Sequence, residues 1–167
     1  MKSTLVAIPL LVTTVLAASA GAQSSAAAGS SEKAHAIVAL PNAITWAAAP
    51  DVLPPGAQAA VLEGDPTQAG PFTLRLAMPA NYRIPPHYHP ATEHVTVLEG
   101  TFYVGMGDSF DATKSTALPT GTFAALGPHV RHYAYTKGRT VIQLHGVGPW
   151  GLIYVNPADD PRKQTSK

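Results

Sequence analysis

The sequence of 167 residues contains no cysteine. This absence excludes disulfide bonds, cysteine-ligated zinc, iron–sulfur clusters and thiol nucleophiles. Charge is also scarce and balanced, with 11 Lys and Arg against 10 Asp and Glu, and removing Lys2 with the N-terminal segment leaves ten against ten. A near-neutral chain offers no electrostatic basis for binding nucleic acid or an anionic membrane, so we expect neither as a partner.

The N-terminal residues have the pattern of a secretory signal peptide. Lys2 is followed by an apolar run over 5–18 and by small residues that predict cleavage after Ala22, with a cut after Ala20 as the alternative. The run is shorter than the roughly 20 apolar residues that span a bilayer, so no stable membrane anchor is expected. We predict that residues 1–22 are removed and that the mature protein is periplasmic or secreted.

Sustained helical periodicity is missing as well. The chain has 14 Gly and 16 Pro, which separate short β-rich runs in the pattern of an all-β sandwich or barrel. We predict a flexible Ala/Ser/Gly-rich tether over 23–43, one β domain over 44–157 and a polar tail over 158–167. Residues 57–62 would also suit a helical turn. The predicted strands are 44–48, 60–63, 72–78, 94–98, 101–105, 122–126, 131–135, 140–145 and 151–155.

Histidines, in contrast, are clustered, and five of the seven fall into two short windows. His87 and His89 are two residues apart, so on an extended backbone their imidazoles point to the same side, and Glu93 keeps that parity beyond the bend at Pro90. The ordinary interpretation of a single histidine is a surface or hydrogen-bonded core residue, but this grouping favours a metal site. Two imidazoles and a carboxylate can bind a divalent cation, and His132 offers a further imidazole from a later strand.

The segment from Asn81 to Gly100 resembles the first motif of the cupin family, G-x5-H-x-H-x3,4-E-x6-G. His87, His89, Glu93 and Gly100 match its defined positions, while Asn81 stands where the leading Gly is expected. Asn also tolerates a left-handed conformation, so the turn can be kept.

The second cupin motif, G-x5-P-x-G-x2-H-x3-N, is matched at Gly121 and His132. Gly127, His129 and Thr136 stand where that motif has Pro, Gly and Asn. The resemblance covers about residues 44–156 and is greatest to the small, single-domain bacterial cupins.

This resemblance implies a small antiparallel β-barrel (a jelly roll) with one divalent transition metal ion inside one open end. His87, His89 and Glu93 would come from one hairpin and His132 from another. These four ligands leave part of the coordination shell open, which distinguishes a reactive metal from a purely structural one. Nitrogen and oxygen ligands favour Fe, Mn, Ni, Co or Zn over a soft ion such as Cu(I).

Other side chains are candidates for the cavity around the metal. His129 would act as a catalytic proton relay at the pocket rim, or would be an exposed turn residue. His94 has the opposite parity to Glu93 and should point away from the metal. Gln143 and His145 share one strand face and would line the cavity or face solvent. The aromatic candidates for the pocket wall are Tyr82, Tyr103, Tyr133 and Trp150.

Two functions are compatible with these features. The first is a metal-dependent dioxygenase or lyase acting on a small organic substrate, with Glu93 as a ligand or as a detachable base. The second is a non-catalytic periplasmic module that binds or senses a metal or another ligand. An enzyme should aim polar groups such as Gln143, His129 or Tyr133 at an open metal position, whereas a storage site should be closed by apolar walls.

Two further expectations follow from the resemblance. Carbohydrate isomerases and epimerases share the barrel but often need no metal. The set of four candidate metal ligands therefore makes an isomerase or epimerase function a poor match. Single-domain cupins commonly pair through edge strands or swapped N-terminal strands, and a lone barrel exposes edges that need cover. We therefore expect a homodimer.

Overall fold

The computed structural model describes residues 36–164. The predicted signal peptide and most of the predicted tether therefore lie outside the described residues. The described part is built from β-strands and short 3-10 helices, which confirms the all-β class. Within it, no helix is long and apolar enough to cross a membrane.

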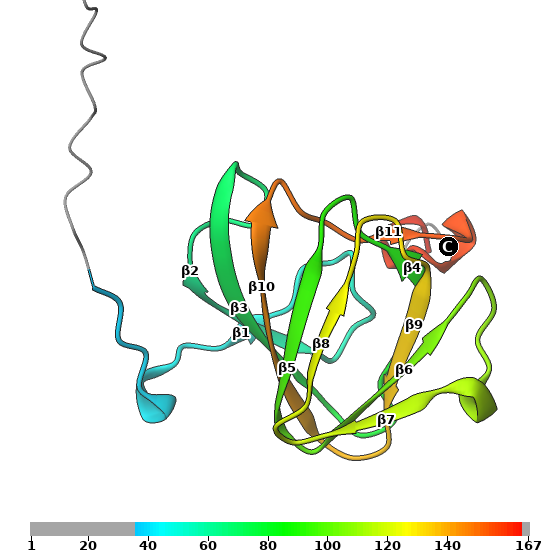
Figure 1. Ribbon diagram of the computed structural model, residues 1–167, viewed down its shortest axis with the longest axis horizontal. Helices are drawn as coiled ribbons and strands as arrows, with labels where there is room; N and C mark the ends of the chain where they lie inside the picture. Colours follow the sequence, from blue (N-terminus) through cyan, green and yellow to red (C-terminus); the bar gives the residue numbers. More distant parts are fainter. Residues whose placement is uncertain (1–35, 165–167) are drawn as a thin grey trace, which may run out of the picture. The chain divides into compact units, whose positions relative to one another are not determined.

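The strands form two antiparallel sheets (Figure 1). The first is six-stranded, in the order β1-β2-β3-β10-β5-β8, and the second is five-stranded, in the order β11-β4-β9-β6-β7. The strand bounds are β1 Ala47–Ala48, β2 Gln58–Glu63, β3 Gly70–Met78, β4 Arg83–Tyr88, β5 Glu93–Glu99, β6 Thr101–Met106, β7 Thr116–Pro119, β8 Phe123–Leu126, β9 His132–Thr136, β10 Thr140–Gly148 and β11 Ile153–Tyr154. The 3-10 helices are η1 Pro41–Ala43, η2 Ala112–Lys114, η3 Pro157–Asp159 and η4 Pro161–Lys163.

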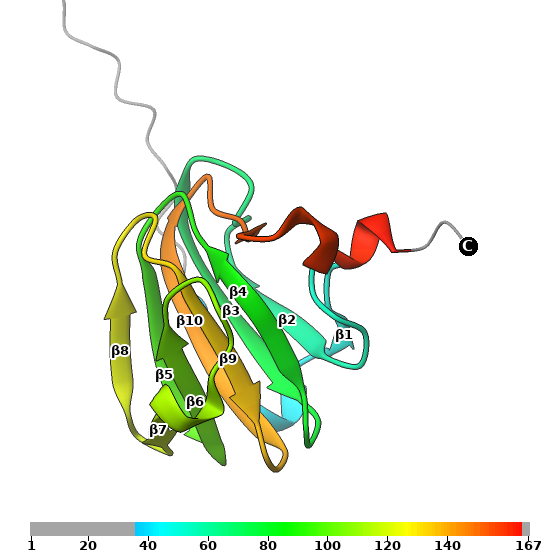
Figure 2. The same ribbon diagram turned by 90° about the vertical axis from the view of Figure 1, so that its right-hand side faces the viewer.

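The hydrophobic core lies between the two sheets, which pack as two layers (Figure 2). Successive side chains of a strand point to opposite faces, so each sheet turns one face toward this core. On β10, Ile142 and Leu144 are buried, and Leu144 pairs with Leu74 of β3. On the outer face, Arg75 Nε donates to Gln143 Oε1 at 3.0 Å. Apolar side chains of β10 therefore face the core, and polar side chains of neighbouring strands pair on the outer face of the sheet.

Two strands are absent from the predicted set, and each has a physical reason. β4 contains Pro85 and Pro86, which have no N–H to donate to a ladder, and its pairing with β9 is irregular between Ile84 and His87. β7 has mostly exposed side chains and no apolar alternation. Residues 57–62, which suit a helical turn by sequence, instead contribute most of β2.

The candidate ligands lie in or directly beside two connections that cross between the sheets. Residues 89–92 lead from β4 in the five-stranded sheet to β5 in the six-stranded sheet, and residues 127–131 lead from β8 back to β9. The expectation that the ligands lie on hairpins is therefore wrong, because the strands on either side of each connection do not pair. The backbone N–H of His129 donates to the carbonyl of His89 at 2.9 Å, which joins the two connections.

Part of the predicted polar tail has regular structure. Residues 157–163 form η3 and η4, each begun by a side-chain cap, from Asn156 and Asp160 respectively. Asp160 is 7% exposed, and its carboxylate also accepts a hydrogen bond from the Arg162 guanidinium at 2.7 Å. These capping contacts account for the two turns, since none of the apolar residues of the segment is buried.

Candidate metal centre

Three histidine side chains converge at one end of the space between the sheets. His87 on β4 lies directly opposite His132 on β9, and His89 follows at the end of β4. Each is 3% exposed, and one ligand nitrogen from each lies within 4.8 Å of the others. The ring centroids of His87 and His132 are 4.2 Å apart. Three imidazoles so close together and so deeply buried form an arrangement that suits a metal ion.

Backbone carbonyls orient all three imidazoles. The Nδ1 atoms of His87, His89 and His132 lie 2.7, 2.7 and 2.9 Å from the carbonyl oxygens of Pro85, Gly151 and Val130, respectively. A carbonyl can only accept, so each Nδ1 carries the proton and each Nε2 keeps a free lone pair. The Nε2 atom of His89 is buried and has no hydrogen-bond partner within the part of the chain that the structure describes. Buried polar atoms normally have a partner, and the partner that fits a lone pair among other lone pairs is a cation.

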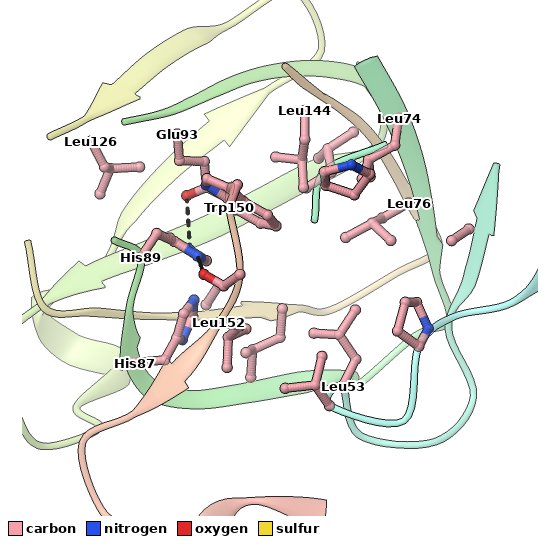
Figure 3. A pocket seen from close by; sticks show the side chains of 18 of the residues that line it. Leu53, Leu74, Leu76, His87, His89, Glu93, Leu126, Leu144, Trp150 and Leu152 are labelled. Atoms are coloured by element: carbon pink, nitrogen blue, oxygen red, sulfur yellow. Dashed lines mark hydrogen bonds and ion pairs between the residues drawn. The ribbon is translucent and has the colours of Figure 1, made fainter. Parts of the chain in front are cut away.

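Glu93 approaches the same cluster from the other sheet (Figure 3). It begins β5, and its Oε2 atom lies 3.5 Å from Nε2 of both His89 and His132. With the residue 7% exposed, the carboxylate is positioned as a fourth donor. A set of three imidazole nitrogens and one carboxylate oxygen fits a divalent ion of the Fe, Mn, Co, Ni and Zn group and does not select one of them.

Burial favours the neutral form of His87 and of His89. Removal from water lowers the pKa of His87 well below its ordinary value, and the neighbouring His132 and His89 lower it further. Burial also lowers the pKa of His89, although Glu93 and the Gly151 carbonyl oppose that effect. Neutral imidazoles are the form that binds metal, so this environment prepares the nitrogens for a cation.

This environment predicts that the metal-free protein loses stability on acidification. The unfolded chain takes up protons at the ordinary histidine pKa of about 6.5, whereas folded His87 and His89 remain neutral to lower pH. Their contribution is therefore complete above about pH 6.5 and is lost as the pH falls below it, by at most about 1.4 kcal/mol per pH unit for each histidine. Urea denaturation of chelator-treated protein between about pH 7.5 and 5.5 measures this slope. A His87→Gln variant should show a shallower slope, and equal slopes would contradict the assignment.

A cavity of about 210 Å³ extends from the histidine cluster between the sheets (Figure 3). The three histidines and Glu93 line one end of it, and nearly all other lining residues are apolar. Pro50, Val61 and Thr67 line the cavity and are exposed, so they mark its mouth. The remaining lining residues are Val52, Leu53, Ala59, Pro66, Leu74, Leu76, Ile84, Phe102, Val104, Leu126, Ala134, Ile142, Leu144, Trp150, Gly151 and Leu152.

Three of the four predicted aromatic wall residues lie elsewhere. Tyr82 is buried in the core, where its hydroxyl donates to the carbonyl of Pro54. Tyr103 stacks on Tyr135, with ring centroids 4.7 Å apart. Tyr133 is completely buried, but its hydroxyl donates to the Asp111 carbonyl at 2.6 Å. Tyr133 and Tyr135 alternate with the cavity-lining His132 and Ala134 on β9, so they belong to the outer face of the sheet.

The other candidate residues also differ in whether they line the cavity. Gln143 and His145 do not line the cavity, because Ile142 and Leu144 occupy the inner face of β10. His94 points away from the cluster, as its parity predicts, and stacks on His145 at 4.8 Å with an interplanar angle of 8°. Trp150 is the aromatic candidate that does line the cavity.

His129 lies on the β8–β9 connection and its side chain is exposed. It does not line the cavity, and its ring packs 5.6 Å from that of Tyr88. A proton-relay role therefore has no geometric basis, and the exposed-turn interpretation describes the residue. His129 and Asn81, which replace motif glycines, have φ angles of 61° and 60°. Asn and His adopt this left-handed region more readily than most residues, so both turns keep the geometry that the motifs require.

Sequence reasoning missed the apolar lining of the cavity. Phe102 and Val104 on β6 alternate with exposed or outward residues, as do Ile142 and Leu144 on β10. The period-two alternation was a usable signal for these strands. Ile84 and His87 both point inward despite their opposite parity, because the β4 pairing is irregular between them, and no sequence pattern indicates that shift.

Two antiparallel sheets that enclose a cavity, with a histidine–glutamate cluster where two connections cross between them, define a cupin. The chain belongs to the ChrR cupin-like domain family, whose model matches residues 34–149. No curated protein matches the sequence.

Solved structures share the fold at low sequence identity. A proposed acetylacetone dioxygenase from Methylibium petroleiphilum superposes with a TM-score of 0.59 and 17% identity, over 77% of this chain and 87% of that one. An RmlC-like cupin from Shewanella frigidimarina has a TM-score of 0.50 and 15% identity, over 64% of this chain and 86% of that one. At such identities the likeness establishes the fold alone.

Proposed function

We propose that this protein is a metal-dependent enzyme, of dioxygenase or lyase type, that acts on a small organic molecule beside the metal. The observation that carries the proposal is the position of the histidine cluster at one end of a cavity. A purely structural metal is normally closed off by its protein ligands, whereas a catalytic one keeps a position facing free space. Here the space next to the ligand nitrogens continues to the protein surface.

The residues of the chain have separable roles in this proposal. His87, His89 and His132 would hold the ion through Nε2, with Glu93 as the fourth donor. A bound divalent ion supplies Lewis-acid or oxygen-dependent chemistry. The apolar walls exclude water and so strengthen electrostatic interactions within the cavity. Glu93 is the only carboxylate among the described residues that line the cavity, which makes it the candidate general base.

The proposal is tested by iron loading followed by a probe of the open position. Protein reconstituted with Fe(II) without oxygen is expected to hold about one equivalent of iron by elemental analysis. It should then bind nitric oxide and give the electron paramagnetic resonance signal of a ferrous nitrosyl, because a small diatomic can reach the ion through the cavity.

The His87→Ala, His132→Ala double variant is the control and should retain neither the iron nor the signal. Iron uptake without a nitrosyl signal would mean that the coordination shell is closed. The enzyme proposal would then be abandoned in favour of a storage or structural site.

One observation favours the alternative, a non-catalytic module that binds or senses a metal or ligand. The polar groups expected to assist catalysis, Gln143, His129 and Tyr133, do not line the cavity, and its walls are apolar. A binding module needs no acid–base partner, so the two functions differ in whether a bound ligand is converted. Recovery of an added ligand unchanged in the presence of iron and oxygen would support the alternative.

We also propose that the protein acts after export and as a homodimer. The support for export is the order of charged, apolar and small residues at the N-terminus. The support for pairing is the common pairing of single-domain cupins through edge strands, together with the edge strands β1, β8, β11 and β7 that end the two sheets.

A further inference from the structure

Trp150 lines the cavity with an unsatisfied hydrogen-bond donor. Its Nε1 atom is buried and has no hydrogen-bond partner among the described residues. The indole is held on two sides, stacked on the His89 imidazole at 4.3 Å with an interplanar angle of 14° and tilted against Phe72 at 5.5 Å. A buried N–H normally has an acceptor, so the molecule that enters this cavity is the natural source of one.

The stacking also places the indole at the metal end of the cavity, beside His89 and Glu93 (Figure 3). One polar group of a ligand would therefore lie near both the cluster and the indole N–H. The rest of the ligand would meet side chains such as Leu74, Phe102 and Leu144, which offer no hydrogen bonds.

The lining sets limits on that ligand. Among the described residues that form the cavity wall there is no Lys, Arg or Asp, and the polar groups away from the cluster are confined to Thr67 at the mouth. Burying a charge or several hydroxyls without partners is strongly unfavourable. A sugar or a zwitterion is thus a poor ligand for this cavity, which also argues against a carbohydrate isomerase function.

The volume of the cavity limits the size of the ligand. An apolar cavity of about 150 Å³ accommodates benzene, so 210 Å³ corresponds to a ligand of roughly eight to ten non-hydrogen atoms.

We infer that the ligand of this cavity is a compact molecule with an apolar body and a single oxygen-bearing end, and that Trp150 is a specificity-determining residue that donates a hydrogen bond from Nε1 to that end. The inference rests on the proposed function, because it assumes that the ligand sits beside the metal. The inference goes beyond the proposed function by assigning a chemical class of substrate and a residue that recognises it.

Calorimetric titration of zinc-loaded protein with two isosteric probes tests the inference. Acetophenone and α-methylstyrene have the same shape and number of non-hydrogen atoms, but only acetophenone carries an acceptor oxygen. Acetophenone is expected to bind the wild type more tightly, and D-ribose should not bind.

Trp150→Phe should reduce acetophenone affinity by about five- to tenfold, the loss typical of one neutral hydrogen bond. It should leave α-methylstyrene affinity nearly unchanged, which separates the lost N–H from any change in packing. Equal losses for both probes, or no loss for acetophenone, would overturn the role of Trp150. Binding of ribose in preference to both aromatic probes would overturn the substrate class.

The metal content of each sample separates failure of the inference from failure of the proposed function. Zinc-loaded protein that binds neither aromatic probe would refute the inference and leave the metal site intact. Protein that takes up no zinc would refute the proposed function itself.

Discussion

His132→Ala is expected to weaken the binding of a divalent metal at least about 100-fold. Loss of a residue that merely orients a metal ligand typically costs 10–100-fold, and His132 is one of three imidazoles whose nitrogens lie within 4.8 Å of one another. The substitution also removes one of the two nitrogens that lie 3.5 Å from the Glu93 carboxylate. Competition with a chromophoric chelator gives the affinity directly.

The matched control is His94→Ala. His94 is adjacent to Glu93 in sequence, but its ring stacks on His145 on the outer face of the six-stranded sheet. The control should bind metal with wild-type affinity. A similar loss in both variants would indicate a general effect on folding, and no loss in His132→Ala would remove that residue from the ligand set.

Gly100→Ala is expected to destabilise the fold by about 2–4 kcal/mol. Gly100 has a φ angle of 76°, a conformation that costs an L-residue energy by itself. An added Cβ would lie 2.4 Å from the carbonyl oxygen of Arg139 and 3.0 Å from Oγ1 of Thr140. Thr140 is fully buried and its hydroxyl is within hydrogen-bond distance of two carbonyls, so it cannot move aside. The midpoint of urea denaturation measures the change.

Gly138→Ala serves as the comparison for this substitution. Gly138 also lies between two strands, but none of residues 36–164 comes within 4 Å of an added Cβ, and its φ angle is not positive. Its replacement should change stability by no more than about 0.5 kcal/mol. If both variants denature at the same urea concentration, the last glycine of the first cupin motif has no steric role here.

Much of the fold was predictable because apolar and polar residues alternate along the strands. That alternation marks β3, β5, β6 and β10 without further information, and the histidine spacing points to a metal cluster. β4 escapes the same reasoning because it contains two prolines, and its irregular pairing brings Ile84 and His87 to one side. Alternation identifies only strands with regular pairing, so β4, which carries His87 and directly precedes His89, is also the hardest strand to recognise.

The cavity wall was less predictable than the ligand cluster. Parity sorts the residues of a strand into two faces but does not say which face is covered by the rest of the chain. Tyr133 illustrates the difficulty, since it lies on the outer side of its sheet and is nevertheless fully buried. Its ring packs 4.9 Å from Phe110, in a loop that returns over the sheet. Only the path of that loop reveals that Tyr133 is enclosed and separate from the cavity.

The distribution of the candidate ligands over both sheets has a consequence for a protein without cysteine. His87 and His132 belong to the five-stranded sheet and Glu93 to the six-stranded sheet. An ion held by all three would fasten one layer of the sandwich to the other, as a disulfide does in many exported proteins. The availability of metal would then govern how much of the chain is folded, because an ion that binds only the folded state raises its free energy of unfolding.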